Sequence, residues 1–402
     1  MLDAIRTCAD DLFPDVVALR RTIHQNPELG LQEHDTAALI AETLRALDLD
    51  DVQTGVYHTG VVGTLHGKKP GPTRLLRADI DALPIHEATG LPFASQNEGN
   101  MHACGHDVHT ASLLGTAMIL SELRDALPGS VRFCFQPNEE KIPGGAKFMI
   151  DEGVLSSDAS GAAVDAVFGQ HVKPSLPVGC IGIRPGMFMA SADELHVTIR
   201  GEGGHAAAPH DLATDVTYAV CQVVSALQSV VSRHCPPGVP SILTIGKLMA
   251  DGATNVIPEA ARFEGTFRAM DEAWRFQAHE LIRRIITQTA AAHGATAEVE
   301  IKVGYPALRN HPAEARLVRD AAVDYVGDDQ TVDLDPWYAG EDFAYFLQER
   351  PGSYYALGIR NEAEGAVHGL HTPQFTVDEN ALRIGSGFMA YLAWRHGQEE
   401  MS

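Results

Sequence analysis

The chain has 402 residues, of which 45% are hydrophobic and 21% charged, so it is globular and too long for one ordinary domain. Thirty Lys and Arg residues face 53 Asp and Glu residues, and the formal net charge of −23 argues against nucleic acid or a membrane as a partner. No apolar run approaches the roughly 20 residues that a membrane span needs.

The N-terminal segment has no basic stretch followed by an apolar one, so the sequence predicts no signal peptide. Six cysteines are scattered along the chain without a CxxC pair, which is not the pattern of a disulfide scaffold. Together these features predict a cytoplasmic protein with reduced thiols.

In chain order, the first part of the sequence alternates helical and strand-like patterns. Helical spacing covers 4–25, 35–47, 106–123 and 145–152, and short apolar runs typical of strands occupy 60–65, 73–78, 130–136 and 166–171. Strands that alternate with helices predict an α/β sheet with helices on both faces.

The pattern changes near Arg184-Pro185-Gly186. The segment that follows predicts strands at 194–200, 242–249, 261–268 and 297–303 and helices at 214–233 and 273–293. The α/β pattern then resumes, with helices at 313–325, 341–347 and 379–394 and a strand at 354–357. We therefore predict one α/β domain formed by residues 1–185 and 301–402, with a separate α+β domain, residues 186–300, inserted into it.

The densest group of reactive side chains is the segment MHACGHDVH, residues 101–109. Cys104 and His106 stand at the start of a predicted helix, and thiolate and imidazole both bind zinc and related metals. On this pair alone, a buried free cysteine beside an unrelated histidine explains the pattern equally well.

A second group follows a predicted strand, where Pro137 stops the strand before Asn138, Glu139 and Glu140. Neighbouring side chains diverge in an extended stretch, so one carboxylate is expected to bind a metal while the other reaches the water beside it. Taken alone, two adjacent glutamates are more often a solvated acidic turn.

Further candidates lie at or just past the ends of other predicted strands. Asp79 and Asp81 follow one strand, His171 ends another, and His368 and His371 lie far down the chain. Open α/β sheets place their sites at the carboxyl ends of strands. The convergence of several ligand-type residues on this edge predicts a metal site.

Nine motifs occur in order along the chain: RADIDALP, HACGHDVHTA, FQPNEE with GGAKFMI, FGQHV, GGHAAAPH, NVIP, GTFR, GEDF and HGLHTPQF. Together they resemble the M20 metallopeptidase family, in the amidohydrolase subgroup that includes aminoacylases, hippurate hydrolases and auxin-conjugate hydrolases. The resemblance spans essentially the whole chain. It implies a two-metal α/β catalytic domain and an inserted α+β lid that often mediates homodimer formation.

The resemblance also implies roles for single residues of the catalytic domain. It implies that the metal ligands are Cys104, His106, Glu140, His171 and His371. These residues would hold two divalent ions, with Zn, Mn, Co and Ni as the candidates. Glu139 is implied as the general base and Asp81 as the aspartate behind a metal ligand, whereas His102 and His109 have no ligand role.

In the lid, the resemblance implies His205 as a donor to the oxyanion and Asn255 and Arg268 as readers of the substrate carboxylate. Without the resemblance, these are a loop histidine, a turn asparagine and a strand-end surface arginine. The chain departs from the subgroup at Asn138, where alanine is usual, and at Gly340, where a small hydroxyl residue is usual. We expect both positions to line the substrate cleft.

The predicted function is metal-dependent hydrolysis of the amide bond of N-acyl amino acids, with Glu139 as the general base. A metallo-carboxypeptidase or dipeptidase on the same scaffold is the alternative, because the sequence does not place the acidic partner that a substrate amino group needs. A catalytically inactive binding protein is disfavoured by the intact Glu139 and the full ligand set.

Overall fold

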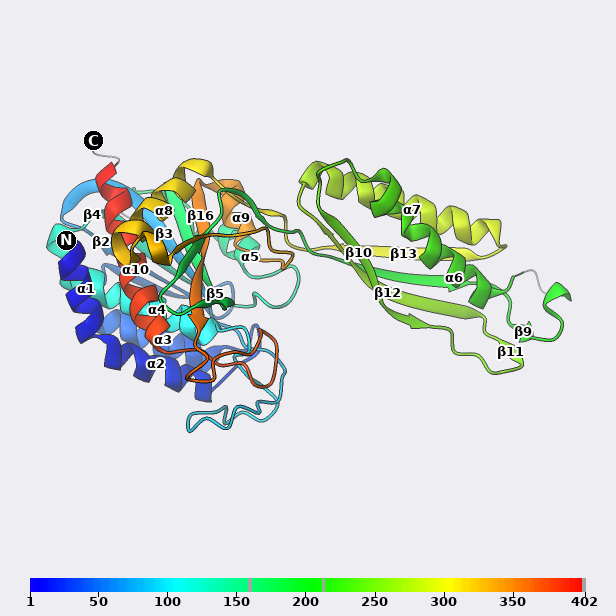
Figure 1. Cartoon of the computed structure of the whole chain (residues 1–402), viewed down its shortest axis with the longest axis horizontal. Coiled ribbons are helices and arrows are strands. Elements are labelled where there is room, and N and C mark those ends of the chain that lie inside the picture. The colour runs from blue at the N-terminus through cyan, green and yellow to red at the C-terminus, as the bar shows by residue number, and fades with distance from the viewer. Residues whose placement is uncertain (158–160, 212–213, 400–402) are drawn as a thin grey trace. The chain divides into compact units, whose positions relative to one another are not determined.

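The chain forms two compact units (Figure 1), and the computed structural model describes residues 1–157, 161–211 and 214–399. Unit 1 comprises Met1–Phe188, Arg309–Asp335 and Asp342–Ser402, and unit 2 comprises Met189–Leu308 and Pro336–Glu341. Unit 2 is thus inserted into the sequence of unit 1. In the described part of the chain, no helix combines the length and the apolar character needed to cross a bilayer.

Unit 1 is built on an eight-stranded mixed sheet with the order β1-β2-β4-β3-β5-β16-β6-β15. Its strands are β1 (Asp51–Val56), β2 (Gly60–His66), β3 (Lys69–Asp79), β4 (Pro128–Gln136), β5 (Ala166–Pro177), β6 (Ile181–Ile183), β15 (Thr331–Asp333) and β16 (Gly352–Arg360). The four central strands β4, β3, β5 and β16 are parallel to one another, whereas β2 and β6 run antiparallel beside them. Because every residue of β4 is buried, this strand is covered on both faces, as is usual in parallel sheets.

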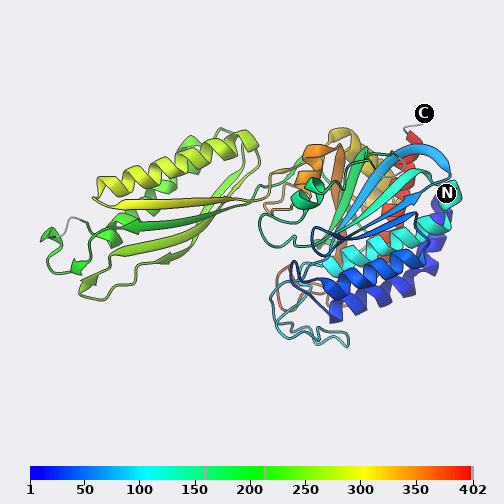
Figure 2. The same ribbon diagram turned by 180° about the vertical axis from the view of Figure 1, so that it is seen from behind.

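Helices cover both faces of this sheet, which confirms the predicted α/β architecture. The helices of unit 1 are α1 (Leu2–Asp11), α2 (Phe13–Gln25), α3 (His34–Ala46), α4 (His106–Glu122), α5 (Ala146–Asp151), α8 (Pro312–Val326), α9 (Ala344–Glu349) and α10 (Asn380–Glu399). The main core lies between one face of the sheet and the helices on that face, which include α4 and α10. The short helices α5 and α9 lie together on the other face (Figure 2).

The strand register brings polar residues of three strands to one edge of the sheet. Asp79, the last residue of β3, pairs with Gln136, the last residue of β4. Arg77 pairs with Gly169 of β5, so His171, two residues later, lies level with Asp79. The loops that follow these strands therefore start from a common edge, where a site can form.

Unit 2 is an antiparallel sheet covered on one face by two helices, as the sequence predicts for an α+β unit. Its strand order is β10-β12-β8-β13, and a two-stranded ribbon, β9 with β11, lies outside it. The elements are β8 (Asp193–Arg200), β9 (Gly204–His205), α6 (Val216–Leu227), β10 (Ser241–Met249), β11 (Val256–Ile257), β12 (Ala260–Ala269), α7 (Glu272–Ala292) and β13 (Thr296–Val303). The alternating residues Leu195, Val197 and Ile199 of β8 are buried in a core beneath α6 and α7.

Two predicted helices differ from the observed ones. The segment 4–25 divides into α1 and α2 around Leu12, because Pro14 occupies the first turn of α2 and favours a helix start there. The segment predicted as one helix up to residue 233 ends as α6 at Leu227 and is followed by a π turn at Val230–His234. Short strands β7 (Gly186–Met189) and β14 (Leu308–Asn310) complete the list of strands.

Candidate metal centre

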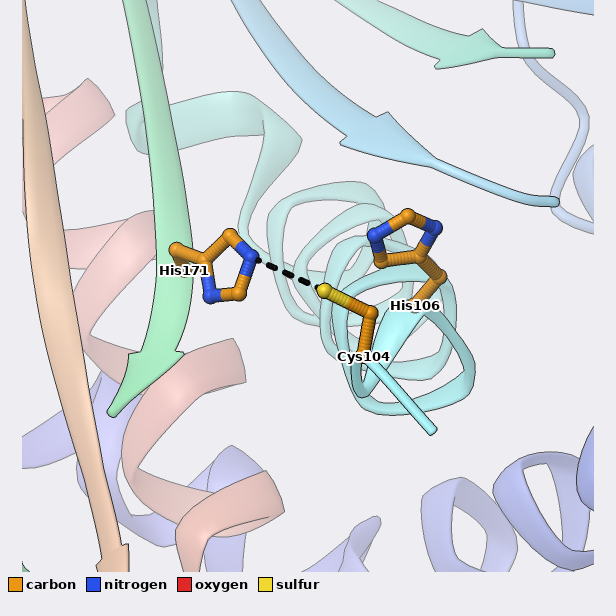
Figure 3. Close-up of side chains that lie close together, drawn as sticks. All are labelled: Cys104, His106 and His171. Carbon is orange, nitrogen blue, oxygen red and sulfur yellow. Dashed lines mark hydrogen bonds between the residues drawn. The ribbon is translucent and has the colours of Figure 1, made fainter. Parts of the chain in front are cut away.

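The Cys-Gly-His turn before α4 lies against β5. Gly105 has a φ of +84°, and a Cβ at this position would lie 2.5 Å from Cγ2 of Val172. Glycine therefore permits both the left-handed turn and the close approach to β5. As a result, Sγ of Cys104 lies 3.5 Å from Nε2 of His171, and His106 begins the helix beside them (Figure 3).

The other two predicted ligands join the same group from distant parts of the chain. Nε2 of His371 lies 3.3 Å from Sγ of Cys104 and 3.4 Å from Oε1 of Glu140. Oε1 of Glu140 lies 3.8 Å from Nε2 of His106. The structure thus brings together all five residues that the resemblance names as ligands, whereas His368 is exposed and belongs to none of these contacts.

The hydrogen bonds of the histidines fix which ring nitrogen is available. Nδ1 of His171 lies 2.7 Å from the carbonyl oxygen of Val172, and Nδ1 of His106 lies 2.9 Å from the carbonyl oxygen of Asp81. A carbonyl only accepts, so each Nδ1 carries a proton, which leaves Nε2 of each ring as the atom at which a metal ion can bind. Support of this kind behind a ring is typical of metal-binding histidines.

Unsatisfied buried atoms also fit a bound cation. Nε2 of His106 and Oε1 of Glu140 are buried and have no hydrogen-bond partner among the residues that the structure describes. An unpaired buried polar atom is costly, and both atoms point into the group of donors described above. The donor set of sulfur, nitrogen and carboxylate oxygen suits zinc and neighbouring divalent transition metals.

The local charge is strongly negative, which favours cations further. Burial, assisted by the carboxylates of Glu140 and Glu139, raises the pKa of the Cys104 thiol well above its usual value. Burial alone would lower the pKa of His106, but Asp79, Asp81 and Glu140 outweigh it and raise this pKa to about 10. These carboxylates favour the protonated forms of the Cys104 thiol and the His106 imidazole. In such a site, a metal ion can bind in place of the protons.

His109 and His102, which have no ligand role in the matched pattern, lie beside this group. Nδ1 of His109 lies 2.6 Å from Oδ1 of Asp79, and its Nε2 accepts the backbone N–H of Val172 at 2.9 Å. Both ring nitrogens of His109 are therefore used within the protein. Burial lowers the pKa of His102 to about 4, so this histidine is neutral near pH 7.

The Glu139–Glu140 pair sits on a tight turn and not on an extended segment. Asn138 has a φ of +57°, and both carboxylates then face His106: Oε2 of Glu139 lies 4.0 Å and Oε1 of Glu140 3.8 Å from its Nε2. Asp81 supports the same region, since its Oδ2 accepts the Glu140 N–H at 2.9 Å and its Oδ1 lies 3.2 Å from Nδ1 of His106.

In unit 2, His205 and Asn255 lie side by side. His205 of β9 pairs with Val256 of β11, and the N–H of Ala206 donates to the carbonyl of Asn255 at 3.0 Å. Nδ1 of His205 accepts the N–H of Ala207 at 3.0 Å, so its proton is on Nε2. The ring is exposed and presents Nε2–H as a hydrogen-bond donor.

Arg268 lies at the opposite end of unit 2 from His205. Strands β8 and β12 pair from Asp193 with Phe267 to Arg200 with Ala260, and Arg268 follows Phe267. Strand β9, which carries His205, lies beyond the other end of these strands (Figure 1). At about 3.3 Å per residue, the two side chains are roughly 25 Å apart. One small substrate therefore does not contact both residues of the same subunit.

The guanidinium of Arg268 is half-buried and forms no ion pair within the described residues. Gly340 lies beside it: a Cβ at this position would be 3.0 Å from Nη1 of Arg268 and 2.8 Å from Cβ of Ala192. The other departure, Asn138, is 4% exposed, and a Cβ at Gly30 would lie 2.4 Å from its Oδ1. Asn138 thus packs against the loop before α3.

Comparison with known proteins agrees with this centre. The sequence model of the family described as Peptidase family M20/M25/M40 matches residues 75–395. The chain belongs to this family. Among its M20 relatives, thermostable carboxypeptidase 2 of Saccharolobus solfataricus is 40% identical over 98% of this chain and 98% of its own. N-acetyl-L-cysteine deacetylase of Bacillus subtilis is 41% identical over 94% of this chain and 87% of its own.

A solved M20 structure shows the same fold. The dinuclear metal-binding peptidase of this family from Bacillus subtilis is 36% identical, with a TM-score of 0.82, over 97% of this chain and 99% of its own. The family and the architecture predicted from the sequence motifs are therefore confirmed, and this M20 chain is a metal-dependent hydrolase.

Proposed function

We propose that this M20 hydrolase cleaves the amide bond of N-acyl amino acids and releases a carboxylic acid and a free amino acid. The observation that carries the proposal is the group of five donor side chains with a further carboxylate, that of Glu139, beside it. A base next to a metal group is the arrangement that amide hydrolysis needs. The deacetylase relative supports an acylated amino acid as substrate.

Two divalent ions, with Zn, Mn, Co and Ni as the candidates, would be held by Cys104, His106, Glu140, His171 and His371. When bound, such ions polarise the scissile carbonyl and lower the pKa of a nearby water. Short supporting contacts behind His106 and His171 hold both rings with Nε2 toward the centre.

Glu139 takes a proton from the attacking water and passes it to the leaving amine. Its carboxylate, 4.0 Å from Nε2 of His106, lies close enough to the donor group to act on a water there. Asp81 positions the surroundings of Glu139 through its contacts with His106 and with the Glu140 N–H. These contacts limit the directions from which the Glu139 carboxylate can reach the reacting water.

Unit 2, the predicted lid, supplies the substrate-binding side chains from two copies of the chain. Arg268 of one copy binds the substrate carboxylate, and Gly340 packs against its guanidinium, where a Cβ would lie 3.0 Å from Nη1. His205 of a second copy donates its Nε2–H to the developing oxyanion, and Asn255 of that copy binds the substrate next to it. The separation of roughly 25 Å between the two ends of unit 2 supports this division, and we therefore propose a homodimer through the lid.

A metallo-carboxypeptidase is the second candidate, because the carboxypeptidase relative is 40% identical over nearly the whole chain. Its substrate also carries a free carboxylate, so Arg268 serves both candidates. A dipeptidase would in addition need an acidic partner for the free substrate amine. The two candidate activities differ in the group on the acyl side of the scissile bond, which is a simple acyl group for the first and a peptide for the second.

The test is a hydrolysis screen of the purified protein with manganese, zinc or cobalt added in turn. N-acetyl, N-benzoyl and indole-acetyl amino acids are compared with dipeptides and with N-blocked peptides that end in a free carboxylate. We expect the N-acyl amino acids to have the highest kcat/KM. A clear preference for the peptides would replace the proposal with the carboxypeptidase or dipeptidase assignment.

A further inference from the structure

Glu33 is a fully buried carboxylate on the segment that leads into α3. Its Oε1 accepts the backbone N–H of Asn138 at 3.0 Å, and its Oε2 accepts the hydroxyl of Thr59 at 2.6 Å. No basic side chain of the described residues forms an ion pair with Glu33. Burial of a carboxylate without a neighbouring cation destabilises the folded state. We therefore expect the Glu33 carboxylate to have a role in holding the Asn138 N–H and the Thr59 hydroxyl.

The backbone amide that Glu33 binds belongs to the turn that carries Glu139. Asn138 adopts a left-handed conformation with φ of +57°, which only a few residue types other than glycine adopt readily. The amide on the other side of Glu139 is held as well, because the N–H of Glu140 donates to Oδ2 of Asp81 at 2.9 Å. Two carboxylates therefore hold the N–H groups of Asn138 and Glu140, the residues on either side of Glu139.

The two anchors differ in what else they hold. Asp81 contacts His106, whereas the contacts of Glu33 are Asn138 and Thr59, neither of which belongs to the donor group. The loop that contains Glu33 also packs closely on the turn, since a Cβ at Gly30 would lie 2.4 Å from Oδ1 of Asn138. Loss of the Glu33 contact would therefore loosen the turn at Glu139 and leave the anchored Glu140 in place.

We propose that Glu33 is a positioning residue that fixes the Asn138 turn and thereby the direction of the Glu139 carboxylate. This inference rests on the proposed role of Glu139 as the general base. A base that is misplaced by about 1 Å loses much of its effect on the rate, although substrate binding and metal binding are retained. The effect of Glu33 should therefore appear in kcat and not in KM.

The experiment compares Glu33→Ala and Glu33→Gln with Glu28→Ala as the matched control. Glu28 lies on the same segment and holds the first amides of α3 at Asp35 and Thr36, but it has no contact with the turn. Glutamine can still accept the Asn138 N–H with its carbonyl and donate to Thr59 with its amide. Each protein is assayed for kcat, KM and bound metal, and amide hydrogen exchange over 137–140 is measured in metal-depleted enzyme.

We expect Glu33→Ala to lower kcat by about tenfold, with KM and metal content unchanged, and to speed exchange at the turn. Glu33→Gln should recover most of kcat, and Glu28→Ala should lower the melting temperature without changing kcat or the exchange at 137–140. If Glu33→Ala does not fold, Thr59→Val carries the same test, because it removes the hydroxyl that fixes the carboxylate.

Normal kcat and normal exchange in Glu33→Ala would overturn the proposal, and so would equal losses in the alanine and glutamine variants. Glu139→Gln, assayed beside them, separates this failure from failure of the proposed function. If Glu139→Gln is inactive but Glu33→Ala is not, Glu33 has no positioning role. If Glu139→Gln retains turnover, the assignment of the base is wrong.

Discussion

Sγ of Cys104 lies 3.3 Å from Nε2 of His371, although 267 residues separate the two in the chain. The backbone reinforces this contact, since the N–H of His371 donates to the carbonyl of Ala103 at 2.8 Å. Cys104 precedes α4, and His371 lies on the loop before α10. A metal ion bound by both would therefore fasten two distant segments of unit 1 to each other.

We predict that removal of metal abolishes activity and lowers the melting temperature, and that a divalent ion restores both. Cys104→Ser should weaken metal binding by tenfold or more, because a hydroxyl is a poor replacement for a thiolate. Cys221→Ser is the control, since Cys221 is exposed on α6. Elemental analysis and thermal unfolding provide the measurements, and full activity without bound metal would contradict the prediction.

The two adjacent glutamates should respond differently to the same substitution. We predict that Glu139→Gln retains bound metal and stability but loses most of kcat, since an amide does not take a proton from water. Glu140→Gln should instead lower the metal content, because Oε1 of Glu140 is the atom that contacts both His106 and His371. Reversed results would mean that the roles within the pair are exchanged.

The apolar pattern predicts only part of the metal centre, since His171 and Glu140 lie at or just past predicted strand ends, whereas the full ligand set with Cys104, His106 and His371 is implied by the resemblance of the motifs. His171 and the residues after Gln136 reach one edge through parallel pairing, as the α/β rhythm predicts. The left-handed turn at Asn138 is not predictable in this way, since Asn adopts both extended and left-handed conformations. The two glutamates that follow it both approach Nε2 of His106, at 4.0 Å and 3.8 Å.

Other features depend on contacts that no local pattern records. Glu33 stands in a polar segment without periodicity, and its role appears only when the Asn138 amide lies 3.0 Å away. Likewise, the motifs that contain His205 and Arg268 give no sign of their separation. That separation depends on the register of β8 and β12, which is set by antiparallel pairing within unit 2.

The division of the lid residues between two copies can be tested by complementation. We predict that His205→Ala and Glu139→Gln are each nearly inactive and that mixed dimers of the two recover activity. In a mixed dimer, one of the two sites has both an intact Glu139 and an intact His205 from the partner. Random reassociation of equal amounts should therefore restore about one quarter of the parent activity.

The matched control mixes His205→Ala with itself, which should remain inactive at every protein concentration. Size-exclusion chromatography establishes whether the chain is dimeric under the assay conditions. A monomer with full activity, or mixed dimers without recovery, would place His205 in its own subunit's site or outside the mechanism.

Recognition of the substrate carboxylate should depend on Arg268. We predict that an N-acyl amino acid is cleaved much faster than its methyl ester, and that Arg268→Ala slows the acid by about tenfold to a hundredfold while leaving the ester nearly unchanged. Arg262→Ala is the control, because Arg262 is an exposed arginine on the same strand. The comparison requires fixed salt, since the net charge of −23 repels anions at long range. Equal kcat/KM for acid and ester in the parent enzyme would refute carboxylate recognition.

The stability of unit 2 in acid should depend on Asp193. This buried carboxylate accepts hydrogen bonds from Nε of Arg275 at 2.9 Å and lies 2.7 Å from Nε2 of His279. Burial opposes its ionisation, but these partners outweigh burial and lower the pKa of Asp193 below the ordinary value of 3.8. A lowered carboxyl pKa stabilises the folded state above the unfolded pKa, and this stability is lost as the pH falls through the folded pKa.

We therefore predict that the contribution of Asp193 is complete near neutral pH and declines only below about pH 4. Asp193→Ala should destabilise the protein by about 3–5 kcal/mol at pH 7, because it leaves the buried Arg275 without its partner. Glu298→Gln is the control: it breaks the exposed pair with Arg200, and it should cause no resolvable change.

Denaturant unfolding of the three proteins from pH 7 to pH 3 measures the effect. The deficit of Asp193→Ala relative to the parent should shrink toward pH 3, because the parent loses the same interaction by protonation. A deficit that grows with acidity would mean that Asp193 is protonated in the folded protein at neutral pH.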